Sequence, residues 1–231
     1  MKNFEPGISS ICRKSLRYIV DADRKVTRYK PWLGDAFSFL YDRIMARSIF
    51  PKKFSASMSD HYNFLKQELD AWHGRRVLEL AAGSGSAINF LPSDNFYTGT
   101  DISPGLLKQA AKRFNEKGFQ EPVFYVVSAE DLPFKGQSFD LCLCILSLNF
   151  FHDAGVVLQR LWEALAPEGV FLCSVPVPER MTADSKIHGA LRSERQLAEI
   201  CESYGFHFDP LPLENGALLY FKARKEVSTN S

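Results

Sequence analysis

Short apolar runs alternate with amphipathic segments along the chain from about residue 75 onward. Runs rich in apolar, β-branched and aromatic residues predict strands, and they lie at Val77–Leu80, Phe96–Asp101, Val123–Val127, Leu141–Leu146 and Val170–Val175. The run Leu141–Leu146 contains only Leu, Cys and Ile, as expected of a strand that is buried on both faces. Strands that alternate with helices predict a parallel sheet covered by helices on both faces.

Capping signals mark where several helices begin. Ser103 followed by Pro104 predicts a helix start, because Ser caps a helix and Pro fits its first position. The segment Asp153–Leu165 places its apolar residues on one face and predicts a second helix. Ser193 and Gln196 have the spacing of a capping box, which predicts a third helix directly after them.

The first 72 residues contain three apolar-rich segments. In residues 8–22, Ile and Leu recur near helical spacing among basic side chains, which predicts a short amphipathic helix. Residues 32–50 form a second apolar-rich segment. We expect a further helix from about Ser59 to Trp72, opened by Ser57 or Ser59 and packed beside the first strand.

These patterns divide the chain into three parts. We expect residues 1–70 to form an N-terminal helical cap or lid, residues 71–225 an α/β domain, and residues 226–231 a disordered tail. The cap is rich in aromatic side chains, namely Trp32, Phe37, Phe39, Tyr41, Phe50 and Phe54. Such a cluster lines an apolar binding site or packs in the core, and the sequence leaves both alternatives open.

A glycine-rich turn joins the first predicted strand to the next segment. Its glycines, Gly83 and Gly85, let backbone N–H groups approach a ligand without an intervening side chain. A dinucleotide-binding turn needs three glycines in the spacing G-x-G-x-x-G. Counted from Gly83 the third position holds Ile88, and counted from Ala81 it holds Ser86. The turn therefore does not match a dinucleotide site.

Two carboxylates flank this turn. Glu79 precedes it and would repel a pyrophosphate, but it suits a ligand with an ammonium group, so the sequence favours a zwitterionic, phosphate-free ligand. Asp101 closes the second predicted strand, twenty-two residues after Glu79, which is the separation typical of a carboxylate that binds both ribose hydroxyls. The alternative is that Asp101 caps the next helix, for which Ser103 is the stronger candidate.

Five segments, in this order, resemble the motifs of class I S-adenosylmethionine-dependent methyltransferases, in the broad group that includes quinone-biosynthesis and other small-molecule methyltransferases. They are Val77–Ser86 (VLELAAGSGS), Gly99–Pro104 (GTDISP), Ala129–Phe134 (AEDLPF), Ser138–Leu141 (SFDL) and Leu165–Val170 (LAPEGV). The resemblance implies a doubly wound, Rossmann-like α/β fold. It implies a seven-stranded, mostly parallel sheet with a final antiparallel hairpin, and S-adenosyl-L-methionine as the cofactor.

The resemblance also implies which residues contact the cofactor. From the methionine end to the adenine end they are Glu79, Ala81, Gly83, Gly85, Leu146, Ser147, Asp101, Ile102, Ala129 and Glu130. Glu79 would lie near the amino group, Leu146 or Ser147 under the sulfonium, and the remaining residues around the ribose and adenine. The chain departs from the pattern where Ala81 and Glu168 replace glycines; Ala81 is small enough for its place, and Glu168 lies away from the cofactor.

Methyl transfer from a sulfonium depends mainly on alignment of the reactants, and a general base is needed only if the methyl acceptor must lose a proton. His152, just beyond the fourth strand, is the candidate base, with a loop or helix-capping position as the alternative. Tyr41, Asp42 and His61 are weaker candidates in the cap. No Asn-Pro-Pro-Tyr motif follows the fourth strand, which argues against methylation of DNA bases or protein glutamine.

Composition narrows the remaining choices. The net charge of +1 does not indicate nucleic-acid binding, yet Lys and Arg number 12 against 6 Asp and Glu in residues 1–60, and 16 against 21 in residues 61–231. The 5 cysteines show no C-x-x-C pair, so we expect buried free thiols, no metal site and a reducing compartment. No apolar run is long enough to span a membrane and no signal-peptide core is present, which predicts a cytoplasmic protein.

We therefore expect an S-adenosylmethionine-dependent methyltransferase that acts at O, N or C of a small, partly apolar molecule. One alternative is an RNA or protein methyltransferase that docks through the basic N-terminal segment. Another is a non-catalytic module that binds the cofactor. The sequence does not identify the acceptor or the oligomeric state, because acceptor pockets come from segments outside the motifs.

Overall fold

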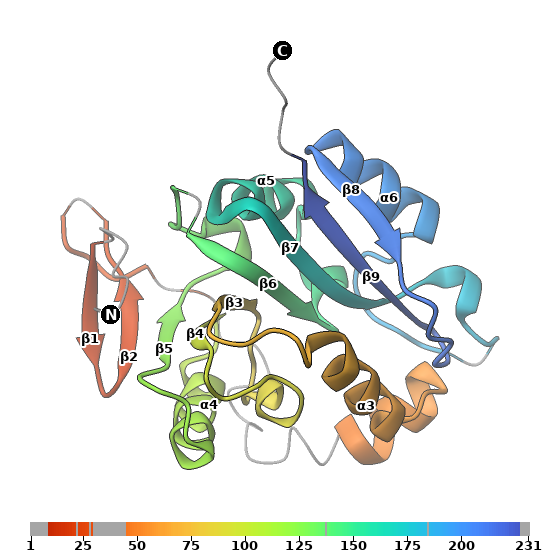
Figure 1. Ribbon diagram of the computed structural model, residues 1–231, viewed down its shortest axis with the longest axis horizontal. Helices are drawn as coiled ribbons and strands as arrows, with labels where there is room; N and C mark the ends of the chain where they lie inside the picture. The colour runs from red at the N-terminus through yellow and green to blue at the C-terminus, as the bar shows by residue number, and fades with distance from the viewer. Residues whose placement is uncertain are drawn as a thin grey trace.

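The structure is a computed structural model that describes residues 9–21, 23–27, 29, 45–136, 138–183 and 185–226. Its centre is a 9-stranded sheet with the strand order β1-β2-β5-β4-β3-β6-β7-β9-β8 (Figure 1). The strands are β1 (Ser10–Arg13), β2 (Leu16–Ile19), β3 (Arg76–Leu80), β4 (Phe96–Asp101), β5 (Val123–Val126), β6 (Phe139–Ile145), β7 (Leu165–Pro176), β8 (Phe206–Pro210) and β9 (Leu218–Lys225).

Helices connect the strands and cover both faces of the sheet. They are a π-helix (Met45–Phe54), α3 (Met58–Leu69), α4 (Pro104–Lys117), α5 (Ala154–Ala164) and α6 (Glu194–Ser203). The capping predictions are confirmed: Ser57 caps α3, Ser103 caps α4 with Pro104 in its first turn, and Ser193 with Gln196 forms the capping box of α6.

The strand directions confirm the predicted fold class. Strands β2, β5, β4, β3, β6 and β7 run parallel to their neighbours in this series, whereas β9 is antiparallel to both β7 and β8. The sheet has nine strands rather than the seven expected, because β1 and β2 extend it beyond β5.

Strands β1 and β2 overturn the predicted amphipathic helix in residues 8–22. The segment folds back at Lys14 and Ser15, whose φ values of 49° and 69° suit a two-residue hairpin turn. Strand β2 then pairs in parallel with β5, placing Arg17 opposite Tyr125 and Tyr18 opposite Val126. The helix prediction is wrong because the strand partner is more than a hundred residues away and leaves no local signal. Residues 10–19 therefore belong to the central sheet.

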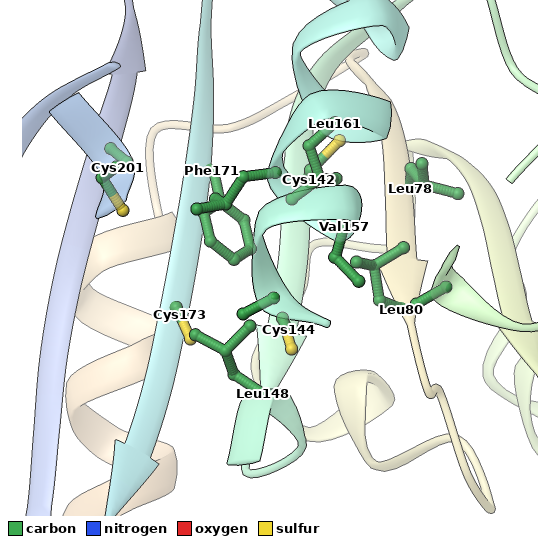
Figure 2. Close-up of a cluster of buried hydrophobic side chains, with 14 of the residues drawn as sticks. Leu78, Leu80, Cys142, Cys144, Leu148, Val157, Leu161, Phe171, Cys173 and Cys201 are labelled. Carbon is green, nitrogen blue, oxygen red and sulfur yellow. The ribbon is translucent and has the colours of Figure 1, made fainter. Parts of the chain in front are cut away.

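Two hydrophobic cores lie on opposite faces of the sheet. Buried residues of α3 and α4 belong to one core, and those of α5 and α6 to the other. In the second core (Figure 2), Cys142, Cys144, Cys173 and Cys201 pack among leucines and Phe171. All four are buried free thiols, as predicted, and Cys12 is free and exposed. Burial raises the pKa of Cys142 well above its ordinary value, so this thiol stays protonated.

Parallel strands bring the functional segments together. The carboxyl ends of β3, β4, β5 and β6 lie at the same edge of the sheet, since these strands are parallel. The glycine-rich turn follows β3, Asp101 ends β4, and Ala129 and Glu130 form a 3₁₀ turn after β5. Leu146 and Ser147 follow β6. This edge, next to the point where strand order reverses between β3 and β6, is where open α/β sheets bind ligands.

Candidate cofactor and acceptor site

The turn after β3 is held in a left-handed backbone conformation at alternate residues. Ala81, Gly83 and Gly85 have φ values of 49°, 54° and 84°. The Ala82 N–H donates to the carbonyl of Thr100 over 2.8 Å, and the Gly83 N–H donates to Oδ2 of Asp101 over 2.9 Å. The turn is therefore fastened to the end of β4.

Asp101 links this turn to the start of α4. Its Oδ1 accepts from the Ser103 N–H over 2.8 Å, while its Oδ2 accepts from Gly83. Ser103 itself caps α4, because its hydroxyl accepts from the Leu106 N–H. Both positions suggested by the sequence thus contribute to the helix start, with Ser103 as the cap and Asp101 as the connection to the glycine-rich turn.

Glu79 is a buried carboxyl group at the base of the turn. The Tyr97 hydroxyl donates to its carboxylate, and Thr100 Oγ1 donates to its backbone carbonyl over 3.0 Å. Burial raises the pKa of Glu79 to about 8, an effect that the Tyr97 hydrogen bond opposes and the charge of Asp101 reinforces. A cation placed beside Glu79 would favour its ionised form, so the group is suited to an ammonium ligand.

Two cavities open at this edge of the sheet and share one wall. The first, which we name the Asp101 cavity, has a volume of about 270 Å³, and its lining includes Asp101, Ile102, Leu106, Ala129, Glu130 and Phe150. The second, the Glu79 cavity, has a volume of about 280 Å³, and its lining includes Phe50, Met58, His61, Tyr62, Glu79 and Arg113. The shared wall consists of Ala81, Gly83, Leu146 and Ser147.

The chemistry of the two linings differs. Apolar side chains of Ile102 and Leu106 lie beside the Asp101 carboxylate, which suits a ring carrying hydroxyl groups. The Glu79 cavity contains an acidic side chain, Glu79, and a basic one, Arg113. This pair suits the ammonium and carboxylate groups of an amino acid. Arg113 reaches the turn from α4 and donates to the Ser84 carbonyl over 3.2 Å. Sequence reasoning missed Arg113, because a long side chain in the middle of a helix carries no motif.

The cofactor-contact residues predicted from the sequence all line one of these two cavities, with the exception of Gly85. Glu130 lines the Asp101 cavity, and its carboxylate accepts from the backbone N–H groups of His152 and Asp153 over 2.7 and 3.1 Å. It therefore holds the loop after β6 against the loop after β5. Gly85 lies on neither cavity lining; a Cβ there would come within 2.9 Å of the Ala110 Cα, so this glycine allows the turn to pack against α4.

The structure separates the two histidine candidates. His152 is exposed, is absent from both described linings, and precedes Asp153, the cap of α5. His61 is buried and lines the Glu79 cavity. Of the cap aromatics, Phe50 and Phe54 are buried. The other candidates, Tyr41 and Asp42 with the aromatics Trp32, Phe37 and Phe39, lie outside the described residues.

The two departures from the methyltransferase pattern share a backbone conformation. Ala81 and Glu168 replace glycines, and both have positive φ, 49° and 60°. A residue with a Cβ is strained there by about 1–2 kcal/mol, which explains why glycine suits these positions. Leu146, on the shared wall, also has positive φ, 61°. Two of the four shared-wall residues are thus strained non-glycine residues, a feature typical of functional sites.

Comparison with known proteins agrees with this geometry. A family model described as a methyltransferase domain matches residues 78–173, from β3 into β7. Over these residues the chain is similar to the class I S-adenosylmethionine-dependent methyltransferases, and its fold agrees with that class. The cofactor of this domain is S-adenosyl-L-methionine, and its nucleoside and amino-acid ends suit the linings of the two cavities.

Relatives extend the comparison beyond the domain. The chain is 32% identical over 105 residues to the ubiquinone/menaquinone biosynthesis C-methyltransferase UbiE of Rickettsia bellii, covering 42% of this chain and 42% of that protein. It is 28% identical over 187 residues to the mitochondrial arginine-hydroxylase NDUFAF5 of Danio rerio, covering 74% of this chain and 54% of that protein. The chain spans about half or less of the length of the first curated relatives that it matches.

A solved structure shows the same fold. The phosphoethanolamine N-methyltransferase 2 of Haemonchus contortus, in complex with S-adenosyl-L-methionine, superimposes with a TM-score of 0.65 at 17% identity, covering 84% of this chain and 57% of that one. Within the described part of the chain, no helix is both long enough and apolar enough to cross a membrane.

Proposed function

We propose that this protein transfers the methyl group of S-adenosylmethionine to a small, partly apolar molecule. The observation that carries the proposal is the shared wall of Ala81, Gly83, Leu146 and Ser147, where the two cavities meet. A ligand whose nucleoside lies in the Asp101 cavity and whose amino acid lies near Glu79 must cross this wall. Its sulfonium would then lie above Leu146 and Ser147.

The proposed mechanism depends on alignment. Bound S-adenosylmethionine supplies an electrophilic methyl group on a positively charged sulfur. Asp101 would accept hydrogen bonds from the ribose, Glu79 would pair with the ammonium group, and the apolar side chains would exclude water. Fixing both reactants in a reactive geometry supplies much of the rate acceleration of such a displacement.

The described part of the N-terminal segment covers the Glu79 cavity in this proposal. Met45 and Phe50 of the π-helix, with Met58 and His61 of α3, contribute to its lining. The Phe54 carbonyl also accepts from the Ala217 N–H over 2.7 Å, which fastens the segment to the turn before β9. We propose that these residues complete the site for the methyl acceptor.

Calorimetry tests the cofactor assignment. We expect S-adenosylmethionine and S-adenosylhomocysteine to bind in the range of about 1–100 μM, or about −8 to −5.5 kcal/mol, and NAD not to bind. Incubation with methyl-labelled S-adenosylmethionine and a panel of small acceptors then tests transfer. Binding without turnover on any acceptor would favour the non-catalytic module. Because one relative, matched over 187 residues, is named an arginine-hydroxylase, products should be analysed by mass rather than by label alone.

A basic cavity favours one second candidate, methylation of a nucleic acid. It has a volume of about 730 Å³, is lined by Arg13, Arg24 and Lys25, and shares Ile102 with the Asp101 cavity. Binding of RNA through these side chains would weaken steeply as salt increases, because phosphate contacts release counterions. Titration of a single-stranded RNA at two salt concentrations, with an Arg13→Ala and Arg24→Ala variant, distinguishes this candidate from a small acceptor.

A further inference from the structure

A chain of buried polar groups runs from the start of α3 to the Glu79 cavity. Asn215 Oδ1 accepts from the Ser57 N–H over 2.7 Å, and Asn215 Nδ2 donates to the Ser57 carbonyl over 2.9 Å. A backbone N–H only donates and a carbonyl only accepts, so these two bonds fix the orientation of the Asn215 amide. Its Nδ2 then donates its second hydrogen to the Tyr220 hydroxyl over 3.3 Å.

The hydrogen bond from Asn215 also determines which group donates between the Tyr220 hydroxyl and His61. Tyr220 is fully buried, with 0% of its surface exposed, and its oxygen lies 2.7 Å from His61 Nδ1. The oxygen already accepts from Asn215, and among the described residues only His61 Nδ1 is placed to accept the phenolic proton. A buried hydroxyl left without an acceptor is costly. Tyr220 therefore donates to His61 Nδ1.

This hydrogen bond determines the tautomer of His61. Burial lowers the pKa of His61 to about 3, so the ring is neutral at physiological pH. A neutral imidazole that accepts at Nδ1 carries its proton on Nε2. Within the described part of the chain Nε2 has no protein partner, and the ring lies between Phe50 and Tyr62 with centroid distances of 5.1 and 5.5 Å. Because His61 lines the Glu79 cavity, its Nε2–H is a neutral donor at that wall.

We propose that His61 donates its Nε2–H to an oxygen of the methyl acceptor, and that the acceptor is an uncharged, largely apolar molecule with a carbonyl or similar oxygen beside its methylated atom. The inference rests on the proposed function. His61 is then a substrate-binding residue that determines specificity, not a general base, because Nε2 already carries a proton. Met45, Phe50 and Met58 supply apolar surroundings, which favour an uncharged acceptor.

Nitrogen NMR of the full chain labelled in histidine tests the tautomer. We expect His61 to show an unprotonated Nδ1 and a protonated Nε2 across pH 6–8. Glu79, Arg113, Tyr62 and Tyr220 are the titratable or charged groups that line the cavity or contact the ring, and Asp60 acts on Tyr220. Tyr220→Phe should shift the tautomer, whereas Tyr62→Phe, the matched loss of a hydroxyl from a neighbouring ring, should not. A proton on Nδ1 in the unmodified protein would overturn the proposal.

Two small probes test the class of acceptor. With S-adenosylhomocysteine saturating, we expect acetophenone to move the His61 Nε2–H signal and ethylbenzene, which lacks the oxygen, to leave it in place. His61→Phe should weaken acetophenone binding about fivefold, the scale of one neutral hydrogen bond, and leave ethylbenzene binding unchanged. If both probes act alike on the unmodified protein, the proposal is wrong, and this comparison does not depend on the variant folding.

The alternative is that His61 Nε2–H donates to the carboxylate of the cofactor and not to an oxygen of the methyl acceptor. 5′-Methylthioadenosine lacks the amino-acid part of S-adenosylhomocysteine, including this carboxylate and the amino group. If only the former moves the Nε2–H signal, His61 binds the cofactor and the acceptor assignment is overturned; we expect neither to move it before acetophenone is added. Failure of S-adenosylhomocysteine to bind at all would instead reject the proposed function, whereas the tautomer result would stand.

Discussion

The Asp101 cavity and the Glu79 cavity are similar in volume but differ in where their walls originate. The walls of the Asp101 cavity come from residues 81–151, inside the span that matches the methyltransferase family. The Glu79 cavity shares four of these residues, but another part of its wall comes from residues 45–62, outside that span. The Asp101 cavity thus lies wholly within the matched span, whereas the Glu79 cavity is lined partly from inside that span and partly from residues 45–62.

The two cavities also differ in how deeply their aromatic side chains are buried. Phe50, in the Glu79 cavity, is 1% exposed, whereas Phe150, in the Asp101 cavity, is 55% exposed. Phe50 packs on Phe54 and His61, with ring centroids 5.7 and 5.1 Å away. Contacts within the protein therefore hold Phe50 in place in the wall of the Glu79 cavity. A bound ligand would cover Phe150 in the wall of the Asp101 cavity.

Phe50→Ala should have the largest effect among the changes that separate the two cavities. Loss of a fully buried Phe ring costs about 3–5 kcal/mol of unfolding free energy, and urea denaturation measures it. Phe150→Ala is the matched control and should change stability by no more than about 0.5 kcal/mol. A loss of less than about 1 kcal/mol for Phe50→Ala would contradict the packed wall and support a segment that opens freely.

Asp101→Ala should reduce both affinity and stability. The carboxylate accepts from Gly83 and Ser103, so its removal leaves two backbone donors without these bonds. We expect S-adenosylhomocysteine affinity to fall by roughly 1.5–3 kcal/mol, the scale of hydrogen bonds to a charged group. Ser193→Ala is the control, because loss of this helix cap also costs about 1 kcal/mol of stability, while Ser193 lies on the lining of neither cavity. Equal effects of the two variants on affinity would mean that Asp101 serves only the helix start.

The pH dependence of binding tests Glu79. Because its pKa is raised to about 8, Glu79 is protonated in the free protein below that pH, whereas an ammonium ligand favours the ionised form. Affinity for S-adenosylhomocysteine should therefore rise as pH increases from about 6 to about 8, by up to about tenfold per unit. Glu79→Gln should remove this dependence, as calorimetry will show. A wild-type affinity that stays constant over this window would contradict the ammonium assignment.

The raised pKa of Glu79 affects the stability of the folded protein in the opposite direction to its effect on ligand affinity. A group whose pKa is higher in the folded protein stabilises the fold most below its unfolded pKa, and this contribution is lost as pH rises through the folded value. The unfolding free energy of the free protein, relative to Glu79→Gln, should therefore fall as pH rises through about 8. Ligand affinity and stability then change in opposite directions over one pH range.

Features encoded locally could be predicted from the sequence. Ser103 with Pro104, the capping box at Ser193, and the carboxylates Glu79 and Asp101 at the strand ends depend on a few neighbouring residues. The motifs also indicated the residues of the shared wall, since parallel strands bring their carboxyl ends to one edge. How each of these residues contacts the cofactor stays a prediction.

Features that depend on distant partners could not be predicted. Strand β2 pairs with β5, about a hundred residues away, and its apolar spacing alone also fits a helix. His61 meets Tyr220 across 159 positions, so no local pattern linked them. His152 was chosen as the candidate base because it follows β6. In the structure its side chain is exposed, and its backbone N–H donates to Glu130.

Phe150→Ala should have the smallest effect and tests the Asp101 cavity itself. Phe150 lines that cavity beside Ile102 and is largely exposed in the free protein, so an adenine bound there would cover the ring. Aromatic contacts are worth about 0.5–1.5 kcal/mol beyond simple burial, and we expect S-adenosylhomocysteine affinity to fall about two- to tenfold. Phe96→Ala, which removes another exposed ring at the start of β4, is the control and should leave affinity unchanged. If Phe150→Ala also binds normally while Asp101→Ala does not, the ribose is held as proposed but the adenine lies elsewhere, and the nucleoside end of the site would need to be redrawn.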